Sequence, residues 1–302
     1  MGYMVCRSYT KTSLITTNQI FMKRTIIFLL ITFLLAACNN RNNKNSIFKD
    51  EKVERAVRKS LNYKDDQEIQ TKDLDSITEI TCIRCTDLSG LRYLRNLKTV
   101  GISFSKINNF SELYNLKKLR TLIIYDCKVS DIRFLSRLNN IEFLYLDDNR
   151  IEDLTPIGSL KQLKKLTLPH NYIKDISILS KLTNIEFINV SDNLIEQLPD
   201  FSHCKNLREL DLQYNNFVCN KNFYKLKQVK KIWFGSNKIN KINWVTTLDS
   251  IKYINVCDNP INYNEAYKDA KIRNLIEKEI LEIDSVAPKR SWLVRFINYY
   301  FD

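Results

Sequence analysis

Residues 140–161 read NIEFLYLDDNRIEDLTPIGSLK, and residues 162–183 read QLKKLTLPHNYIKDISILSKLT. The two stretches align without a gap, with apolar residues at the second, fifth and seventh places and asparagine at the tenth. The same frame holds in eight units of 22 residues, which start at 96, 118, 140, 162, 184, 206, 228 and 250. Eight units in phase indicate a repeat architecture in which each unit is one coil.

Places five and seven predict a short strand in every unit. They are apolar throughout, as Leu144 and Leu146 illustrate, and side chains two apart lie on one face of a strand, so this face is expected to be buried. The tenth place must turn the chain inside the stack, where a buried asparagine can bond backbone groups of adjacent coils. The expected ladder is Asn149, Asn171, Asn193, Asn215, Asn237 and Asn259. Ser105 and Cys127 take this place in the first two units.

The remaining apolar places line a return path. Places twelve, fifteen, eighteen and twenty-one are mostly apolar, and one coil cannot bury its own face, so stability must come from stacking neighbours. A unit about two residues shorter precedes the eight, starting near Ile77. The predicted fold class is an α/β solenoid: a leucine-rich-repeat horseshoe with a concave parallel β-sheet, an N-terminal helical cap and a C-terminal helical cap.

Both ends of the array carry helical patterns. Asp50 resembles a helix N-cap that is followed by an apolar stripe, and a second short turn starts at Thr71. Residues 264–283 carry a further helical stripe. We expect a helical cap at 47–76, repeats at 77–262, and a C-terminal cap and tail at 263–302. The aromatic, basic tail at 292–301 is expected to pack on this cap; contact with a membrane is the alternative.

The N-terminus predicts export. Residues 22–37 combine a basic start, a short apolar run and small residues before Cys38, which is the order of a secretory signal peptide. The run is too short for a spanning helix. Its Leu-Ala-Ala-Cys ending resembles the bacterial lipobox, which implies a lipid on Cys38; an ordinary cleaved signal is the alternative. Residues 1–21 are interpreted as a mis-annotated start, and residues 38–46 as a flexible tether.

Charge limits the choice of partners. Removal of residues 1–37 lowers the net charge from +13 to +9, which could favour anionic glycans or acidic partners. The charges are scattered, and an exported protein seldom meets nucleic acid. We therefore expect a protein partner, a membrane contact through the N-terminal lipid, no nucleic acid, and a monomer.

Short motifs carry a resemblance to a known family. The stretches VSDI at 129–132, IEDLTPI at 151–157 and IKDI at 173–176 resemble the repeat turns of internalins, a family of bacterial surface proteins. Residues 48–80, with TKDL at 71–74, resemble the helical cap of that family. The resemblance covers about residues 48–262 of the 302.

The resemblance implies a protein-binding horseshoe that recognises a host or cell-surface partner through its concave face. The chain departs from the family in showing no immunoglobulin-like domain after the repeats and no wall-sorting signal. Attachment would instead use the lipid on Cys38, and host invasion does not carry over with the fold.

Places four, six and eight of each strand should form the concave face. They hold Tyr125, Phe143, Tyr145, Phe187, Trp233 and Tyr253. Arg120, Lys165 and Lys231, with Glu209 and Asp211, are expected to surround these rings as a polar rim. Exposed aromatic patches are unusual on soluble proteins and favour a binding site. The alternative is that the rings pair across the sheet for stability alone.

The sequence favours neither catalysis nor a cofactor. It has two histidines, His170 and His203, no nucleophile with an evident base, and no glycine-rich phosphate loop. Aspartates on the concave side are read as a solvated face in preference to a calcium site. Cys82–Cys85 and Cys204–Cys219 are candidate disulfides, although small buried thiols explain these cysteines as well.

Three functions remain open. The leading hypothesis is a lipid-anchored surface protein for adhesion or for interaction with host or neighbouring cells, in the outer membrane or at the cell surface in preference to the inner membrane. The alternatives are a periplasm-facing envelope scaffold or inhibitor, and a cytosolic regulatory scaffold if the signal is spurious. The same repeats would serve all three.

Overall fold

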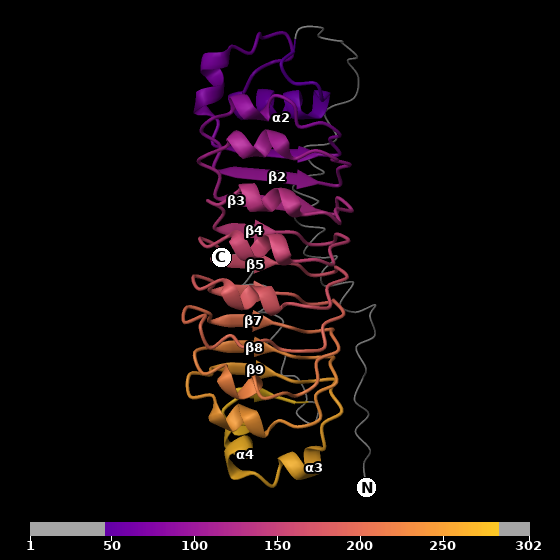
Figure 1. Ribbon diagram of the computed structural model, residues 1–302, viewed down its shortest axis with the longest axis vertical. Coiled ribbons are helices and arrows are strands. Elements are labelled where there is room, and N and C mark those ends of the chain that lie inside the picture. Colours follow the sequence, from indigo (N-terminus) through magenta and orange to yellow (C-terminus); the bar gives the residue numbers. More distant parts are fainter. Residues whose placement is uncertain (1–45, 284–302) are drawn as a thin grey trace. The chain divides into compact units, whose positions relative to one another are not determined.

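The computed structural model describes residues 46–283. Within these residues, ten strands form one parallel sheet in sequence order (Figure 1). The predictions for 1–21, the signal peptide at 22–37, Cys38, most of the tether and the tail at 292–301 lie outside these residues. The strands are β1 (Glu79–Ile83), β2 (Thr99–Ser103), β3 (Thr121–Tyr125), β4 (Phe143–Tyr145), β5 (Lys165–Thr167), β6 (Phe187–Asn189), β7 (Glu209–Asp211), β8 (Lys231–Trp233), β9 (Tyr253–Asn255) and β10 (Leu281–Glu282).

The register of the sheet follows the repeat. Leu122 pairs with Leu144, 22 positions on, and the same offset holds from β2 to β9. The short first unit shifts this offset, because Ile80 of β1 pairs with Val100 of β2. A constant offset places equivalent side chains of all coils in straight rows. The predicted leucine-rich-repeat solenoid is thus confirmed.

Short 3-10 helices form the return path opposite most strands. Their apolar residues and those of places five and seven fill the interior; Leu144, Leu146 and Ile157 are fully buried. The helices are η1 (Thr71–Ser76), η2 (Leu91–Tyr93), η3 (Ser111–Asn115), η4 (Arg133–Arg137), η5 (Thr155–Ser159), η6 (Ser177–Lys181), η7 (Phe223–Lys225) and η8 (Asn243–Thr247). Each coil is closed by its two neighbours.

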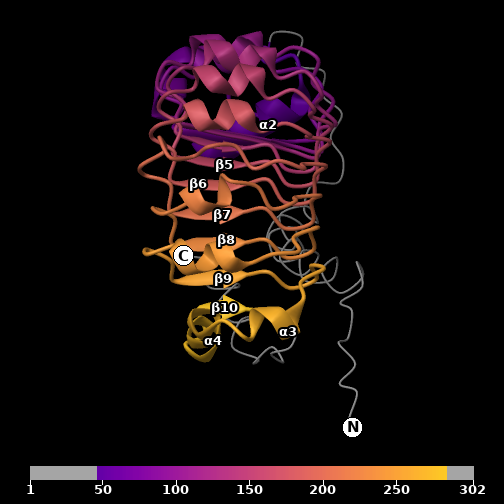
Figure 2. The same cartoon turned by 60° about the horizontal axis from the view of Figure 1, so that its bottom comes forward.

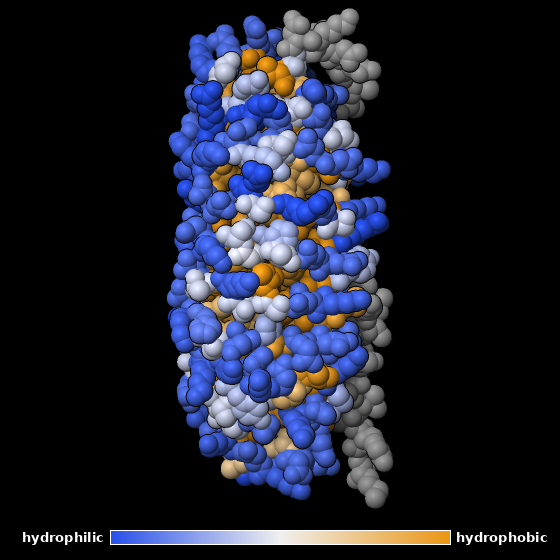
Figure 3. Space-filling model, in the orientation of Figure 1, coloured by the Kyte–Doolittle hydropathy of each residue, from blue (hydrophilic) through white to orange (hydrophobic). Residues whose placement is uncertain are grey.

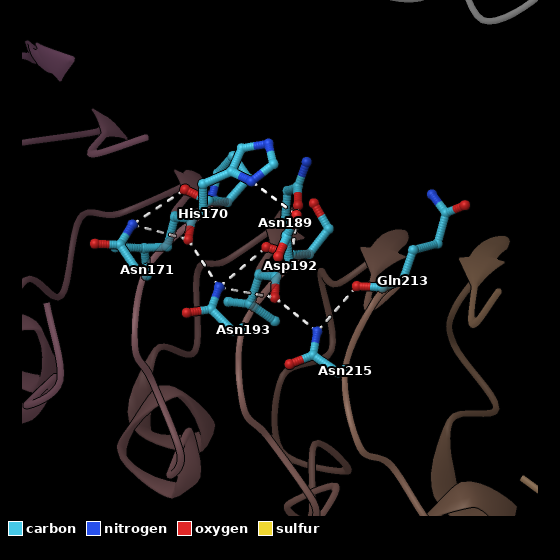
Figure 4. A network of polar contacts seen from close by, with 11 residues as sticks. His170, Asn171, Asn189, Asp192, Asn193, Gln213 and Asn215 are labelled. Atoms are coloured by element: carbon cyan, nitrogen blue, oxygen red, sulfur yellow. Dashed lines mark hydrogen bonds and ion pairs between the residues drawn. The ribbon is translucent and has the colours of Figure 1, made fainter. Parts of the chain in front are cut away.

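The asparagine ladder forms at place ten, as Asn193 shows (Figure 4). Its Nδ2 donates to the carbonyl oxygens of Leu168, Val190 and Ser191 at 3.0, 3.1 and 3.0 Å, and its Oδ1 accepts the N–H of Ile173 at 3.0 Å. One side chain therefore satisfies backbone groups of its own coil and of the preceding coil.

The first three coils use smaller side chains in the ladder. Cys127 Sγ contacts the carbonyl oxygens of Ile102 and Tyr125 at 3.5 and 3.3 Å. Ser105 Oγ accepts the N–H of Cys85 at 3.0 Å, which places Cys85 in the ladder of the short unit. Sequence reasoning missed this role of Cys85, although its distance of 20 residues from Ser105 could have indicated it.

The N-terminal cap begins with α2 (Glu51–Leu61), whose N-cap is Asp50. The Asp50 carboxylate accepts the N–H of Lys52 at 2.8 Å and that of Thr86 at 2.6 Å, so the cap is fastened to the first coil. Arg58 is buried and donates to Glu54 Oε1 at 2.7 Å. Paired charges let the helix cover the apolar end of the stack.

The C-terminal cap differs from the continuous helical stripe expected at 264–283. The chain forms α3 (Tyr263–Ala266), α4 (Ala270–Glu277) and the tenth strand β10, at the end of the stack (Figure 2). Asp269 starts α4 anew by accepting the N–H of Lys271 at 2.8 Å. The open edge of β9 needs hydrogen-bond partners, and β10 supplies them. For example, Val256 donates its N–H to Glu282 O at 3.0 Å.

Within residues 46–283, no helix is long and apolar enough to cross a membrane.

Candidate protein-binding face

The predicted concave face, which keeps this name below, is the surface of the sheet formed by the side chains at places four, six and eight. These side chains leave the sheet on the side opposite to the buried places five and seven. The place-four row from β4 to β9 is Phe143, Lys165, Phe187, Glu209, Lys231 and Tyr253. The place-six row on the same strands is Tyr145, Thr167, Asn189, Asp211, Trp233 and Asn255. The predicted aromatic residues at these two places thus lie on one surface, in two groups.

The first group surrounds Lys165. Its Nζ lies 5.5 Å from the ring centre of Tyr145 and 4.9 Å from that of Phe187, and Phe143 is its cross-strand neighbour on the other side. Burial lowers the pKa of Lys165. A cation above aromatic faces is held by their quadrupoles. Lys165 is therefore a central part of this group, whereas the sequence placed it on the rim.

Phe187 is less accessible than expected. Its exposed fraction is 6%, and the Lys165 ammonium lies over its ring. A partner reaches this ring only if the lysine side chain moves. Tyr145 and Phe143 are half-buried and remain available at the surface.

The second group is Trp233 with Tyr253. Their ring centres are 5.7 Å apart with the planes inclined at 53°, an arrangement in which the rings contact along an edge. The Tyr253 hydroxyl donates to Glu282 of β10. Burial, followed by this carboxylate, raises the pKa of Tyr253. The C-terminal cap therefore holds one of the predicted binding residues.

Tyr125 belongs to a separate edge of the face. Its ring meets Phe104 edge-on at 5.3 Å. Burial raises its pKa, and the neighbouring carboxylate of Asp148, to which its hydroxyl is hydrogen-bonded, raises it further. Tyr125 stands at place eight, so it lies beside the central group and outside the place-four and place-six rows.

A polar floor separates the two aromatic groups. Thr167, Asn189 and Asp211 are 4%, 6% and 4% exposed. Burial raises the pKa of Asp211 from 3.8 to about 6. Next to this floor, Glu209 Oε1 pairs with Lys231 Nζ at 3.1 Å. Its Oε2 is buried without a hydrogen-bond partner among the described residues, which is unusual for a charged acceptor.

An acidic stripe follows the strands at places eight and nine. His170 Nδ1 lies 2.8 Å from Asp192 Oδ2 (Figure 4), and this hydrogen bond raises the pKa of His170. Burial raises the pKa of Asp147 to about 6. Asp148, His170 and Asp192 adopt left-handed φ values of 56°, 54° and 50°. The described residues hold no cluster of three or more His, Cys, Asp or Glu arranged to bind a metal ion.

Family models match two features of the chain. Residues 117–159 and 161–203 each match the model described as Leucine Rich repeats (2 copies). Residues 22–39, which include Cys38, match the model of the prokaryotic membrane lipoprotein lipid attachment site. The repeats are leucine-rich repeats.

The chain is similar to solved structures of leucine-rich-repeat proteins, which include internalins. Internalin C2 of Listeria monocytogenes is 23% identical, with a TM-score of 0.64, over 72% of this chain and 99% of that one. The internalin InlF of the same species is 24% identical, with a TM-score of 0.58, over 79% and 83%. A leucine-rich-repeat protein of Leptospira interrogans is 22% identical, with a TM-score of 0.53, over 64% and 56%. These likenesses establish the fold. No curated protein matches the sequence.

No disulfide joins the cysteines of the described residues 46–283. These cysteines are Cys82, Cys85, Cys127, Cys204, Cys219 and Cys257. The candidate disulfides Cys82–Cys85 and Cys204–Cys219 are thus not formed. Cys82 shares a hydrogen bond with Cys85 that raises the pKa of Cys82 and lowers that of Cys85. Ladder and core packing account for the buried thiols.

Proposed function

We propose that the chain is a lipid-anchored binding protein of the bacterial envelope that holds a protein partner on its concave face, without catalysis. The observation that carries the proposal is the pair of aromatic groups on this face. Tyr145 and Trp233 are four strands apart, which corresponds to about 19 Å at about 4.8 Å per strand. Large, half-buried rings of this kind are the side chains that dominate binding energy at protein interfaces.

The polar residues between the groups support the same proposal. Glu209 Oε2 has no partner among residues 46–283, and Asp211 keeps a carboxylate where burial disfavours its charge. A donor from a partner would satisfy Glu209 Oε2 and would stabilise the buried charge of Asp211. The fold alone gains nothing from Glu209 Oε2, because an unsatisfied buried acceptor costs stability.

Truncation of the rings tests the proposal. Tyr145→Ala and Trp233→Ala are each expected to weaken partner binding by about 2 kcal/mol, which is about 30-fold, with little change in melting. The measurement is capture from host-cell and envelope extracts with the tagged chain, followed by titration of the captured protein.

An aromatic residue outside the concave face provides the matched control. Tyr172 is 52% exposed, so Tyr172→Ala removes an equivalent ring elsewhere. A partner that Tyr145→Ala, Trp233→Ala and Tyr172→Ala all bind with the affinity of the unmodified chain would refute the concave-face proposal.

Attachment and orientation are tested at Cys38. We propose that this residue carries the lipid and that the protein faces outward from the outer membrane or cell surface. Protease added to intact cells should cleave the tagged chain, and Cys38→Ala should release it from the membrane fraction. Protection until the envelope is opened would instead favour a periplasm-facing scaffold. A soluble, unprocessed chain in the cytosol would favour a cytosolic scaffold.

A further inference from the structure

A column of charged side chains runs along the edge at which the chain enters each strand. Its members stand at place three, and each donates its N–H to the carbonyl of the preceding member: Lys230 to Arg208 at 2.7 Å, and Lys252 to Lys230 at 2.7 Å. Members of the column are therefore direct neighbours, about 4.8 Å apart. From first to last they are Lys98, Arg120, Glu142, Lys164, Glu186, Arg208, Lys230 and Lys252.

In the N-terminal half of the column, one carboxylate forms ion pairs with the cations on both sides of it. Glu142 lies between Arg120 and Lys164, with ion pairs of 3.3 and 2.7 Å. Arg120 is also fastened to the turn, where its Nη1 donates to Lys117 O and Leu119 O at 3.3 and 3.1 Å. Arg120, Glu142 and Lys164 therefore form one ion-paired group, whereas Lys98 forms no ion pair within residues 46–283.

In the C-terminal half, Arg208 corresponds to Arg120, but no glutamate follows it in the column. Arg208 Nη1 donates to Lys205 O and Leu207 O at 2.6 and 3.2 Å, as Arg120 does at its own turn. The next member is Lys230 in place of a glutamate, followed by Lys252. Glu186, which precedes Arg208, forms no ion pair with it among the described residues.

Like charges in directly opposed positions of a sheet are destabilising. Lys230 and Lys252 are exposed, and neither pairs with a carboxylate within residues 46–283. Asp249 is the nearest acidic residue in sequence to the last member, and it too forms no ion pair there. No ion pair within the described residues therefore offsets the repulsion among the three adjacent cations Arg208, Lys230 and Lys252.

A hollow of about 480 Å³ includes in its lining Lys205, whose carbonyl oxygen accepts a hydrogen bond from Arg208. It is lined by Lys205, Lys225 and Lys227 together with Tyr224. Lys225 is paired with Asp200 at 2.5 Å, whereas Lys205 and Lys227 have no acidic partner in the described chain. Figure 3 shows hydrophilic side chains extending along the left margin of the stack from end to end. The hollow thus adds two uncompensated cations and an accessible ring beside the column.

We infer that the run Arg208–Lys230–Lys252, with Lys205, Lys227 and Tyr224 beside it, binds a linear anionic polysaccharide. A straight row of cations at about 4.8 Å intervals matches a polymer that carries sulfate or phosphate groups at a similar spacing. Tyr224 offers a ring face for a sugar. The run lies in the last three units, at the end of the stack opposite to Ile47.

The test is titration of the lipidated chain from Cys38 onward, in neutral detergent, with fluorescent heparin as the probe. Lys230→Glu gives residues 208, 230 and 252 the Arg–Glu–Lys order of residues 120, 142 and 164, so this variant should melt no lower than the unmodified chain. It should nevertheless weaken heparin binding at least tenfold. Glu142→Lys should create a second run and strengthen binding.

Lys98→Glu is the matched control, because it makes the same change of charge in the same column but outside the run. It should change heparin affinity less than twofold. Equal losses for Lys98→Glu and Lys230→Glu would show that only net charge matters and would overturn the inference. So would competition by phosphatidylglycerol vesicles with no response to heparin, which would assign the run to a membrane.

The inference is independent of the concave face. Trp233→Ala should leave heparin binding unchanged, so the two proposals can fail separately.

Discussion

Asn193→Ala is expected to lower the free energy of unfolding by about 4 kcal/mol, because it leaves several buried backbone groups without partners at once. Asn193 is 6% exposed and makes four hydrogen bonds to the backbone of two coils. Alanine removes all four of these hydrogen bonds. Urea unfolding followed by circular dichroism measures the loss.

The control for this prediction is Asn206→Ala, which removes an exposed asparagine at the first place of a unit. Its effect should stay within about 0.5 kcal/mol. The converse change, Cys127→Asn, should stabilise the chain by about 1 kcal/mol, because it completes the ladder with a stronger donor. A loss below about 1 kcal/mol for Asn193→Ala would contradict the ladder as a source of stability.

Asp211→Asn is expected to raise the free energy of unfolding by about 3 kcal/mol at pH 7.5, because burial raises the pKa of this carboxyl from 3.8 to about 6. Asparagine fits the site: Asn189 holds the same place one coil earlier, and its Oδ1 accepts the N–H of Ser191 at 2.9 Å. Asp211 Oδ1 accepts the N–H of Gln213 in the same way, at 3.2 Å.

The sign of the pH dependence follows from the direction of the shift. Between pH 3.8 and 6 the folded state holds the Asp211 proton more strongly than the unfolded state does. This group therefore favours the folded state at low pH, and its contribution falls as the pH rises towards the folded-state pKa. The advantage of Asp211→Asn should be nearly absent at pH 4 and fully developed at pH 7.5.

Asp200→Asn is the control, because the pKa of Asp200 is shifted in the direction opposite to that of Asp211. The side chains of Lys225 and Ser202 hold the pKa of Asp200 below its usual range, so this substitution should not stabilise the chain at neutral pH. Stabilisation of equal size by Asp200→Asn and Asp211→Asn, or a gain for Asp211→Asn that is independent of pH, would contradict burial of the Asp211 charge. Melting curves across pH 4–8 distinguish these outcomes.

Local repetition made most of the fold predictable. Alternating apolar residues such as Leu144 and Leu146 identify the strand and its buried face, and the recurrence of asparagine at place ten identifies the ladder. The rows of the concave face follow from the same frame, because a constant offset between strands aligns equivalent side chains. Asp50 was recognised as a helix cap for the similar reason that capping depends on adjacent residues.

The departures all involve contacts between coils. The helical pattern at 264–283 is locally sound, but the open edge of β9 recruits Leu281–Glu282 as a strand. Lys165 was expected on the rim and instead lies over the ring of Phe187, 22 residues away. Cys85 was read as half of the candidate disulfide Cys82–Cys85 and instead takes a ladder position beside Ser105.

The sequence by itself determined the coil, the strand, the ladder and the face that each side chain occupies, because these depend on a 22-residue frame that every unit restates. Only the tertiary structure decided which of those side chains remain available. Stacking brings residues of neighbouring coils to about 4.8 Å. At this distance Lys165 covers the ring of Phe187, Glu282 accepts a hydrogen bond from the hydroxyl of Tyr253, and Glu142 pairs with Arg120. Lys230 instead places a second cation beside Arg208. A periodic sequence specifies where each residue points, but its exposure and its charge balance are set by the neighbour that the stack places beside it.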